Sequence, residues 1–214
     1  MKSQVITAFT ILTFSLTAAH AVEGDPVAGK QAVAVCQSCH QPDGSGMNIP
    51  GGESWPKLAG LNASYLYKQL LDIKEGTRKS PTMNPFVDML NEQQLKDVAV
   101  YYSQLPPNEG KGGEKATDEQ LARGEKLATD GDWNRYIVPC SSCHGSDNQG
   151  AGDHFPGIAG QHAGYIADQL RAWKSGKRDN DPQHLMLAIA ERLDDEDIVA
   201  VSAWLSRQPA KPAK

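Results

Sequence analysis

The 214-residue sequence has little of several features that would assign it to common functional classes. Aromatic residues make up 7% of the chain, and the formal net charge is −5. The absence of a basic patch or stripe argues against a nucleic-acid partner. No stretch keeps up an alternation of polar and apolar residues, so we expect almost no β-strand. Beyond residue 21 no apolar run is long enough to cross a membrane.

The N-terminus differs from the rest of the chain. Lys2 is followed by an apolar run from Val5 to Ala19 and then by the A-x-A pattern at 19–21. This order is typical of a secretory signal peptide, and the run is too short and too rich in threonine for a good bilayer span. We therefore expect cleavage after Ala21 and export of the mature protein to the periplasm.

Cysteine is scarce, and all four cysteines belong to two copies of one pattern, C-x-x-C-H, at 36–40 and 140–144. This pattern is the attachment signature of a c-type haem. The two thiols form thioethers with one porphyrin, and the histidine that follows becomes an axial ligand of the iron. The sequence therefore predicts two covalently bound haem c groups, held by Cys36, Cys39 and His40 and by Cys140, Cys143 and His144.

Other uses of these cysteines fit less well. A structural disulfide is plausible in an exported protein, but it does not explain a histidine after each second cysteine. A thioredoxin-like redox pair expects a βαβ context, which neither motif has. A zinc site would have to combine ligands about 100 residues apart, against the close pairing that is usual in such sites.

The two halves of the chain are repeats of one unit. The segment Trp55–Gly60 matches Phe155–Gly160, and Tyr65, Gln69, Leu70, Gly76 and Arg78 match residues 100 positions later. Capping and periodicity predict three helices in each unit, at 26–35, 62–76 and 91–105 and at 117–129, 162–175 and 194–206. We expect a signal peptide at 1–21, a first domain at 22–105, a linker at 106–116, a second domain at 117–208 and a flexible tail at 209–214.

A second axial ligand is expected for each iron, and the repeat selects it. Met186 is the only methionine of the second unit, and it corresponds to Met83 in the first. Each lies seven residues before the leucine that precedes the last helix, and we expect the stretch around Met83, residues 80–85, to be irregular. Met89 corresponds to Arg192 and is expected to pack in the core, and Met47 lies too close to His40. The rival histidines lack a matching histidine in the other unit, so we expect them at the surface or beside a ligand: His154, His162 and His184.

With these residues placed, the chain resembles the cytochrome c4 family of dihaem cytochromes over essentially the whole mature sequence. The resemblance rests on both C-x-x-C-H motifs, the W/F-P-x-L/I-A-G stretches, the Y-x-x-x-Q-L helices and the two methionines. It implies an all-α fold: a tandem pair of class I cytochrome c domains related by a pseudo-twofold axis, with the haem propionate edges facing across the interface. It also implies close crossings of Gly29 with Tyr101 and of Gly124 with Trp204. One departure is a Gly-rich loop with four extra residues between Cys36 and Pro56.

The resemblance implies a periplasmic electron carrier, with redox proteins as partners. Members often carry electrons from a cytochrome bc-type complex to a terminal oxidase. One alternative is the haem subunit of a dehydrogenase, such as flavocytochrome c sulfide dehydrogenase. An enzyme of its own, such as a dihaem peroxidase or a thiosulfate-oxidising cytochrome, fits less well. Such an enzyme needs an open coordination position at one iron, or an unusual ligand such as cysteine. Here both methionines are present, and no cysteine is left over.

Overall fold

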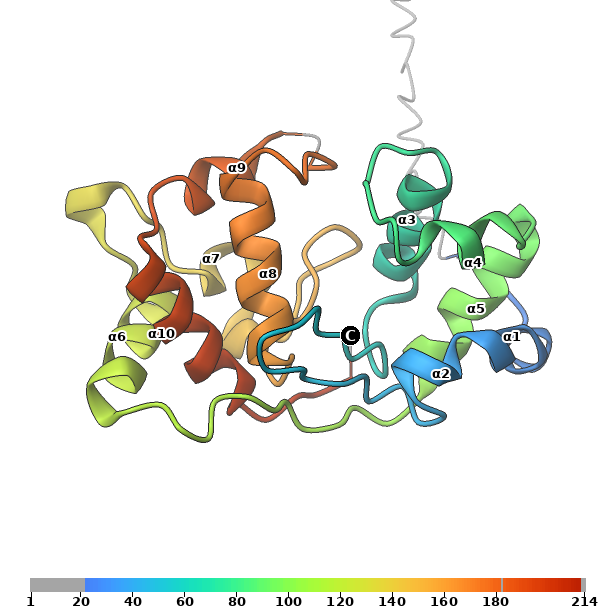
Figure 1. The fold of residues 1–214 in the computed structure, drawn as a ribbon, viewed down its shortest axis with the longest axis horizontal. Helices are drawn as coiled ribbons and strands as arrows, with labels where there is room; N and C mark the ends of the chain where they lie inside the picture. The colour runs from blue at the N-terminus through green and yellow to red at the C-terminus, as the bar shows by residue number, and fades with distance from the viewer. Residues whose placement is uncertain (1–21, 182, 213–214) are drawn as a thin grey trace, which may run out of the picture.

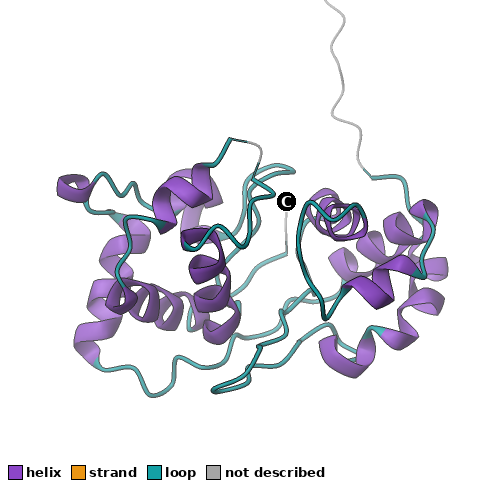
Figure 2. Cartoon of the chain, turned by 45° about the horizontal axis from the view of Figure 1, so that its top comes forward, coloured by secondary structure: helices purple, strands orange, loops and turns teal. Residues whose placement is uncertain are grey.

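The computed structural model describes residues 22–181 and 183–212, which form two groups of helices lying side by side (Figures 1 and 2). The first group contains α1 (Pro26–Ala32), η1 (Val33–Val35), α2 (Gln37–His40), α3 (Ala63–Lys74), α4 (Asn84–Asp88) and α5 (Glu92–Gln104). The second contains α6 (Asp118–Thr129), η2 (Trp133–Arg135), α7 (Ser141–His144), η3 (Ser146–Asn148), α8 (Ala163–Lys174), α9 (Leu185–Ala190) and α10 (Asp195–Ser206). Within the described residues extended backbone pairs only in isolated bridges, so the all-α prediction is confirmed.

Five of the six longer helices begin at a side chain that caps them, whereas α8 begins after His162 without such a cap. Asn91, Thr117 and Asp194 each accept a hydrogen bond from the backbone of the third helical residue, whose side chain bonds back to the cap. These capping boxes satisfy amide groups that have no partner inside the helix. At the start of α1, Asp25 caps the helix and Pro26 occupies the first turn. Local chemistry therefore determines most helix boundaries.

The short helices are not evident from the sequence. The stretch around Met83, predicted to be irregular, leads into the short helix α4, and Met186 lies in the first turn of the short helix α9. Each C-x-x-C-H motif also forms its own helical turn, α2 or α7. Helices of four to six residues are not stable alone, and their sequences carry little periodicity, so tertiary contacts decide whether they form.

The first and last helices of each group cross at a glycine. A Cβ on Gly29 would lie 2.2 Å from the carbonyl oxygen of Asp97 in α5, and one on Gly124 would lie 2.2 Å from that of Ala200 in α10. The same hypothetical carbons would lie 2.8 Å and 2.7 Å from the Cβ atoms of Tyr101 and Trp204. Both close crossings implied by the resemblance are therefore confirmed.

Each helix group has its own apolar core. The cores contain Val33, Leu66, Val98, Ala99 and Tyr102 in the first group, and Leu127, Ile137, Ile166, Leu170, Ile198, Val201 and Leu205 in the second. A smaller cluster of Ile73, Val87 and Leu95 lies beneath Met83. The cores come from helices that also surround the two C-x-x-C-H motifs, so the packing that forms each domain also builds its site.

The linker and the tail are more ordered than the sequence suggested. Lys111 bonds through its backbone to both His162 and Ala163, at 3.1 and 2.9 Å, and Gly113 is buried against α10. The linker therefore packs against the second domain. In the tail, the amide of Lys211 donates to Gln149 at 2.7 Å. Both segments lie along the boundary between the domains, where contacts distant in sequence fix them.

Candidate haem-binding sites

Each site is built from a helical turn that carries two cysteines and a histidine. In the first domain α2 places Cys36, Cys39 and His40 on one turn, and the backbone amide of His40 bonds to the carbonyl of Cys36 at 2.9 Å. The His40 ring is 4% exposed, and its Nδ1 lies 2.9 Å from the carbonyl oxygen of Pro56. A carbonyl can only accept, so Nδ1 donates and Nε2 keeps its lone pair for a metal.

The second domain repeats this geometry. His144 on α7 is 8% exposed, and its Nδ1 donates to the carbonyl oxygen of Pro156 at 2.7 Å. Phe155 packs edge-on against the ring, with the centroids 6.4 Å apart. Burial lowers the pKa of both histidines below the usual value, while the bonded carbonyls oppose this change. Both imidazoles are thus favoured in the neutral form that binds metal.

The surroundings of the cysteines argue against a disulfide, a redox-active pair or a zinc site at the two motifs. The four thiols form no disulfide with one another. Burial raises the pKa of Cys140 to about 11, whereas redox-active C-x-x-C thiols have a lowered pKa. Among the described residues no group of three or more cysteine, histidine or acidic side chains is placed to bind a zinc ion. The local geometry is therefore consistent with a cofactor attached to each motif.

One large cavity joins the two motifs. Its volume is about 1120 Å³, and both domains line it. The predicted ligand and thioether residues all line this cavity: Cys36, Cys39, His40, Met83, Cys140, Cys143, His144 and Met186. Met83 packs on the small core cluster beneath α4, and Met186 packs on the core of the second domain. The cavity wall is mainly apolar, with polar groups concentrated where the domains meet.

The rejected ligand candidates are placed differently. Met89 is 64% exposed, so the interpretation of this residue as core packing is wrong. Met47 is 41% exposed and does not line the cavity. His184 is exposed and bonds to Asp179, and His154 is an exposed residue at the cavity edge. His162 is buried between the domains, contrary to the expectation of a residue at the surface or beside a ligand.

Two arginines converge where the domains meet: Arg178 is buried and Arg78 is half-buried. Arg78 donates to Gln69 of its own domain at 2.9 Å and to Gln169 of the other at 3.1 Å. Arg178 does the converse, donating to Gln169 at 2.6 Å and to Gln69 at 2.9 Å. This reciprocal pattern follows the repeat, as expected for a pseudo-twofold arrangement.

The arginine pair leaves positive charge at the cavity. Within the described residues neither guanidinium has a carboxylate within 4.0 Å. Burial lowers the pKa of Arg178, and the neighbouring charge of Arg78 lowers it further. The Arg178 guanidinium also stacks on Trp173, 3.9 Å from the ring centroid. One buried and one half-buried cation beside the same cavity favour an anionic group within it.

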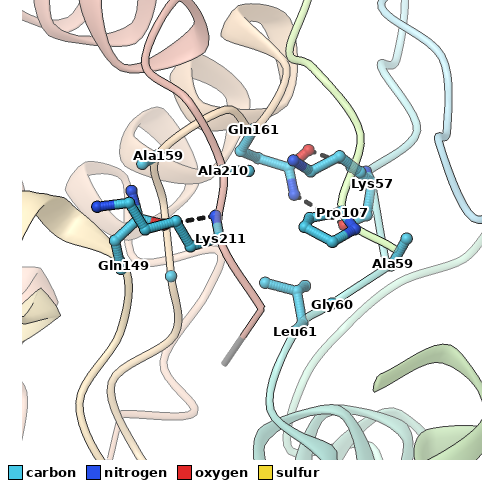
Figure 3. A pocket seen from close by; sticks show the side chains of 11 residues that line it. Lys57, Ala59, Gly60, Leu61, Pro107, Gln149, Ala159, Gln161, Ala210 and Lys211 are labelled. Atoms are coloured by element: carbon cyan, nitrogen blue, oxygen red, sulfur yellow. Dashed lines mark hydrogen bonds between the residues drawn. The ribbon is translucent and has the colours of Figure 1, made fainter. Parts of the chain in front are cut away.

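A second set of contacts joins the domains away from the cavity. Gln161 accepts from the backbone amide of Lys57 and donates to its carbonyl, both at 2.9 Å (Figure 3). The nearby pocket of about 10 Å³ has room for no more than a water molecule. The extra residues of the Gly-rich loop also contact the second domain, since Asn48 accepts from Gly164 at 2.9 Å. These contacts fix the relative placement of the two sites.

Comparison with known proteins agrees with this arrangement. The Cytochrome c family matches residues 26–106 and again 121–208. A thiosulfate dehydrogenase electron acceptor from Thiomonas intermedia is 40% identical over 85% of this chain and 82% of its own. Cytochrome c4 from Thiocapsa roseopersicina is 39% identical over 85% of this chain and 92% of its own. The crystal structure of reduced cytochrome c4 from Pseudomonas stutzeri superposes with a TM-score of 0.78 at 35% identity, covering 87% of this chain and 100% of that one.

The chain belongs to the cytochrome c4 family. It is a dihaem electron-transfer cytochrome that carries two covalent haem c groups, not an enzyme in its own right. None of the described helices is long and apolar enough to span a membrane.

The described residues fit the haems that the family requires. The cavity is lined by both attachment motifs, and the two arginines meet the need of anionic propionates for positive partners. Two buried donors that line the cavity, Tyr102 Oη and Trp173 Nε1, have no hydrogen-bond partner among the residues that the structure describes. Orphaned polar atoms are rare in folded proteins, so their position on the cavity wall is consistent with polar groups of a cofactor as their partners.

Sequence reasoning did not assign a function to the residues at the domain boundary. Gln69 and Arg78 were recognised as repeated positions, but their meeting with Gln169 and Arg178 depends on how the domains dock. The available signal was the repetition of a glutamine and an arginine nine residues apart in both halves. Trp173 and His162 lack even that signal, because each has a different residue at the matching position of the first unit.

Proposed function

We propose that the protein is a periplasmic carrier in which His40 and Met83 bind one iron and His144 and Met186 bind the other. The thioethers would come from the two cysteine pairs already described. The observation that carries this proposal is the single cavity lined by both motifs and both methionines. When bound, each haem c supplies one iron that accepts and releases one electron.

The residues of the chain then have distinct tasks. The carbonyls of Pro56 and Pro156 orient the two imidazoles and maintain the tautomer that ligates through Nε2. Met83 and Met186 would bind the irons together with His40 and His144, and a methionine ligand would raise the reduction potential relative to a second histidine. Arg78 and Arg178 stabilise negative charge at the domain boundary. The apolar wall keeps water from the sites.

The route proposed for the electrons is from a cytochrome bc-type donor to a terminal oxidase. Two haems in one chain allow an electron to enter at one domain and leave at the other. We place the mature protein in the periplasm, after removal of residues 1–21, because covalent haem attachment and the signal sequence point to the same compartment. The signal segment lies outside the described residues.

A dehydrogenase as the electron donor is the second candidate. The relative from Thiomonas intermedia, 40% identical, is named a thiosulfate dehydrogenase electron acceptor. The present chain would then accept electrons from a thiosulfate-oxidising enzyme or from another periplasmic dehydrogenase, such as the flavoprotein of sulfide oxidation. Both candidates have the same chemistry at the haems and differ in the docking partner.

The test compares electron transfer with substrate turnover. Purified protein with both haems should reduce membranes that contain a haem–copper oxidase, and it should show negligible peroxidase and thiosulfate-oxidising activity alone. Adding a purified thiosulfate dehydrogenase with thiosulfate distinguishes the two donors. Peroxide turnover by the isolated protein at roughly 1–10³ per second, the usual range for enzymes, would contradict the carrier function.

A further inference from the structure

The second domain has a segment without a counterpart in the first. Gly29 precedes Cys36 by seven residues, whereas Gly124 precedes Cys140 by sixteen. The nine additional residues, 130–138, follow α6 and include η2. We call this segment the aromatic loop because its tip carries Trp133 and Tyr136. In Figure 1 it is the yellow turn at the upper left-hand end of the molecule, on the side away from the first domain.

The aromatic loop has a defined conformation. The backbones of Asp132 and Ile137 exchange two hydrogen bonds, of 2.7 and 2.9 Å, across its base. Arg135 donates to Asp132 at 2.7 Å and to the fully buried Asp197 of α10 at 2.6 Å. Ile137 anchors the loop in the core. Tyr136 adopts a left-handed backbone with φ of 56°, an unfavourable conformation for a bulky residue that the surrounding contacts maintain.

The two aromatic side chains that this frame supports are left in solvent. Trp133 is 67% exposed and Tyr136 is 77% exposed. Neither therefore contributes much to the core, although the loop is anchored on both sides of them. Trp, Tyr and Arg are the residues enriched at the energetic centres of protein interfaces. A rigid loop also loses little conformational entropy when it binds.

The position of the loop connects it to the second haem site. Directly after Tyr136, the chain continues through residues that line the cavity, Ile137, Val138 and Pro139, and reaches the attachment residue Cys140. A protein that covered the two aromatic side chains would therefore lie against the segment that forms the wall of this site. The outer position of the loop leaves the contact between the domains undisturbed.

The surface beside the loop is acidic. Asp195 and Glu196 at the start of α10 have side chains that are 84% and 83% exposed. Asp194 is half exposed, and Arg123 pairs with it at 2.9 Å and with Glu196 at 2.6 Å, so part of this negative charge is compensated. Asp130, at the beginning of the loop, is also exposed. Such a rim favours a basic partner and repels anionic phospholipid or a second copy of the same acidic face.

We propose that the aromatic loop is the docking site of the second domain for a redox protein with an apolar depression surrounded by lysine and arginine. This inference rests on the proposed electron-carrier function and names the kind of partner that the second site accepts. One electron moves in each productive encounter, so one protein is oxidised as the other is reduced. No bond forms or breaks in the step.

The experiment uses the protein with both haems and a double variant, Trp133→Ser with Tyr136→Ser. The matched control is Met89→Ala, which removes an apolar side chain that is 64% exposed on the first domain. Second-order rate constants for electron exchange are measured with oxidase-containing membranes and with a purified thiosulfate dehydrogenase. Ferricyanide serves as a small oxidant that needs no docking surface. Sedimentation reports the oligomeric state of each variant.

Loss of two aromatic anchors should slow exchange with at least one protein partner by about tenfold or more, because anchors of this type dominate interface energies. Exchange with ferricyanide and the behaviour of Met89→Ala should stay at the wild-type level. Equal rates for the double variant and the wild type with both partners would overturn the loop assignment while leaving the carrier function intact. The loop assignment would also be overturned if the double variant exchanged electrons with ferricyanide more slowly to the same extent. It would be overturned as well if the wild-type protein were a dimer that the double variant could not form. Wild-type protein that reacts with neither partner would instead contradict the proposed function.

Discussion

The Gly29→Ala substitution should destabilise the first domain through the crossing of α1 and α5. The added Cβ would lie 2.2 Å from the carbonyl oxygen of Asp97, 2.7 Å from its carbonyl carbon and 2.8 Å from the Cβ of Tyr101. Contacts of carbon with backbone oxygen are normally above about 3 Å, so α5 has to move by roughly 1 Å. The obstacle is helix backbone, which cannot rotate away as a side chain can.

The size of the effect follows from two opposing terms. Overpacking costs typically about 1–3 kcal/mol, and a backbone obstacle places this site toward the upper end. Alanine regains up to about 1 kcal/mol because it has a higher helix propensity than glycine. We therefore expect a net loss of about 2 kcal/mol. For a domain of this size that loss lowers the melting temperature by roughly 10 °C.

The assay is thermal unfolding of the protein with both haems, followed by circular dichroism and by Soret absorbance. Lys30→Ala is the control, because Lys30 is exposed on the same helix and lysine and alanine both favour helices. Gly124→Ala should destabilise the second domain to a similar extent, since its obstacle lies at the same 2.2 Å. A Gly29→Ala protein as stable as the Lys30→Ala control would refute the steric reasoning.

Acid should weaken the contact between the domains, because burial lowers the pKa of His162 below about 6.5 and the charges of Lys57 and Lys111 lower it further. The unfolded chain then binds the proton first, so this stabilisation is complete above about pH 7 and is lost as the pH falls below about 6.5. In the His162→Gln variant, the urea concentration at the unfolding midpoint should therefore fall less steeply as the pH is lowered. Replacing Cys36 and Cys39 with serine should leave the first domain largely unfolded, because its helices are too short to be stable without a large apolar cofactor; a cooperative melt like that of the haem-loaded protein would contradict this. Electron transfer to a basic partner should slow as salt rises, since exposed charges are screened over about 10 Å at 0.1 M ionic strength.

Much of the fold could be predicted because its signals are local. Capping residues such as Asn91 and Thr117 act on amides within one turn, and the long helices begin where these residues place them. The C-x-x-C-H motif carries its chemistry within five residues. The repeat adds independent support, because it pairs Met83 with Met186 by their positions in the two units alone. Both methionines do line the cavity that the two motifs share.

The remaining features depend on contacts between distant parts of the chain. His162 bonds to Ser45, 117 positions away, and no local pattern could show that this histidine is buried. The Gly-rich loop was recognised as a departure from the repeat, but its role in domain contact emerged only from the placement of Asn48 against Gly164. Met89 was expected in the core because the repeat pairs it with Arg192 and not with a methionine, whereas the short helix α4 ends just before it and turns it to solvent.

The most direct test of the central claim is the weak near-infrared charge-transfer band of the oxidised, haem-loaded protein, which reports methionine bound to ferric iron. If both irons are closed by methionine, Met83→Ala and Met186→Ala should each remove half of the band, and Met89→Ala should leave it unchanged. The account would be contradicted if Met89→Ala removed the band, or if the band survived in full without Met83 or Met186.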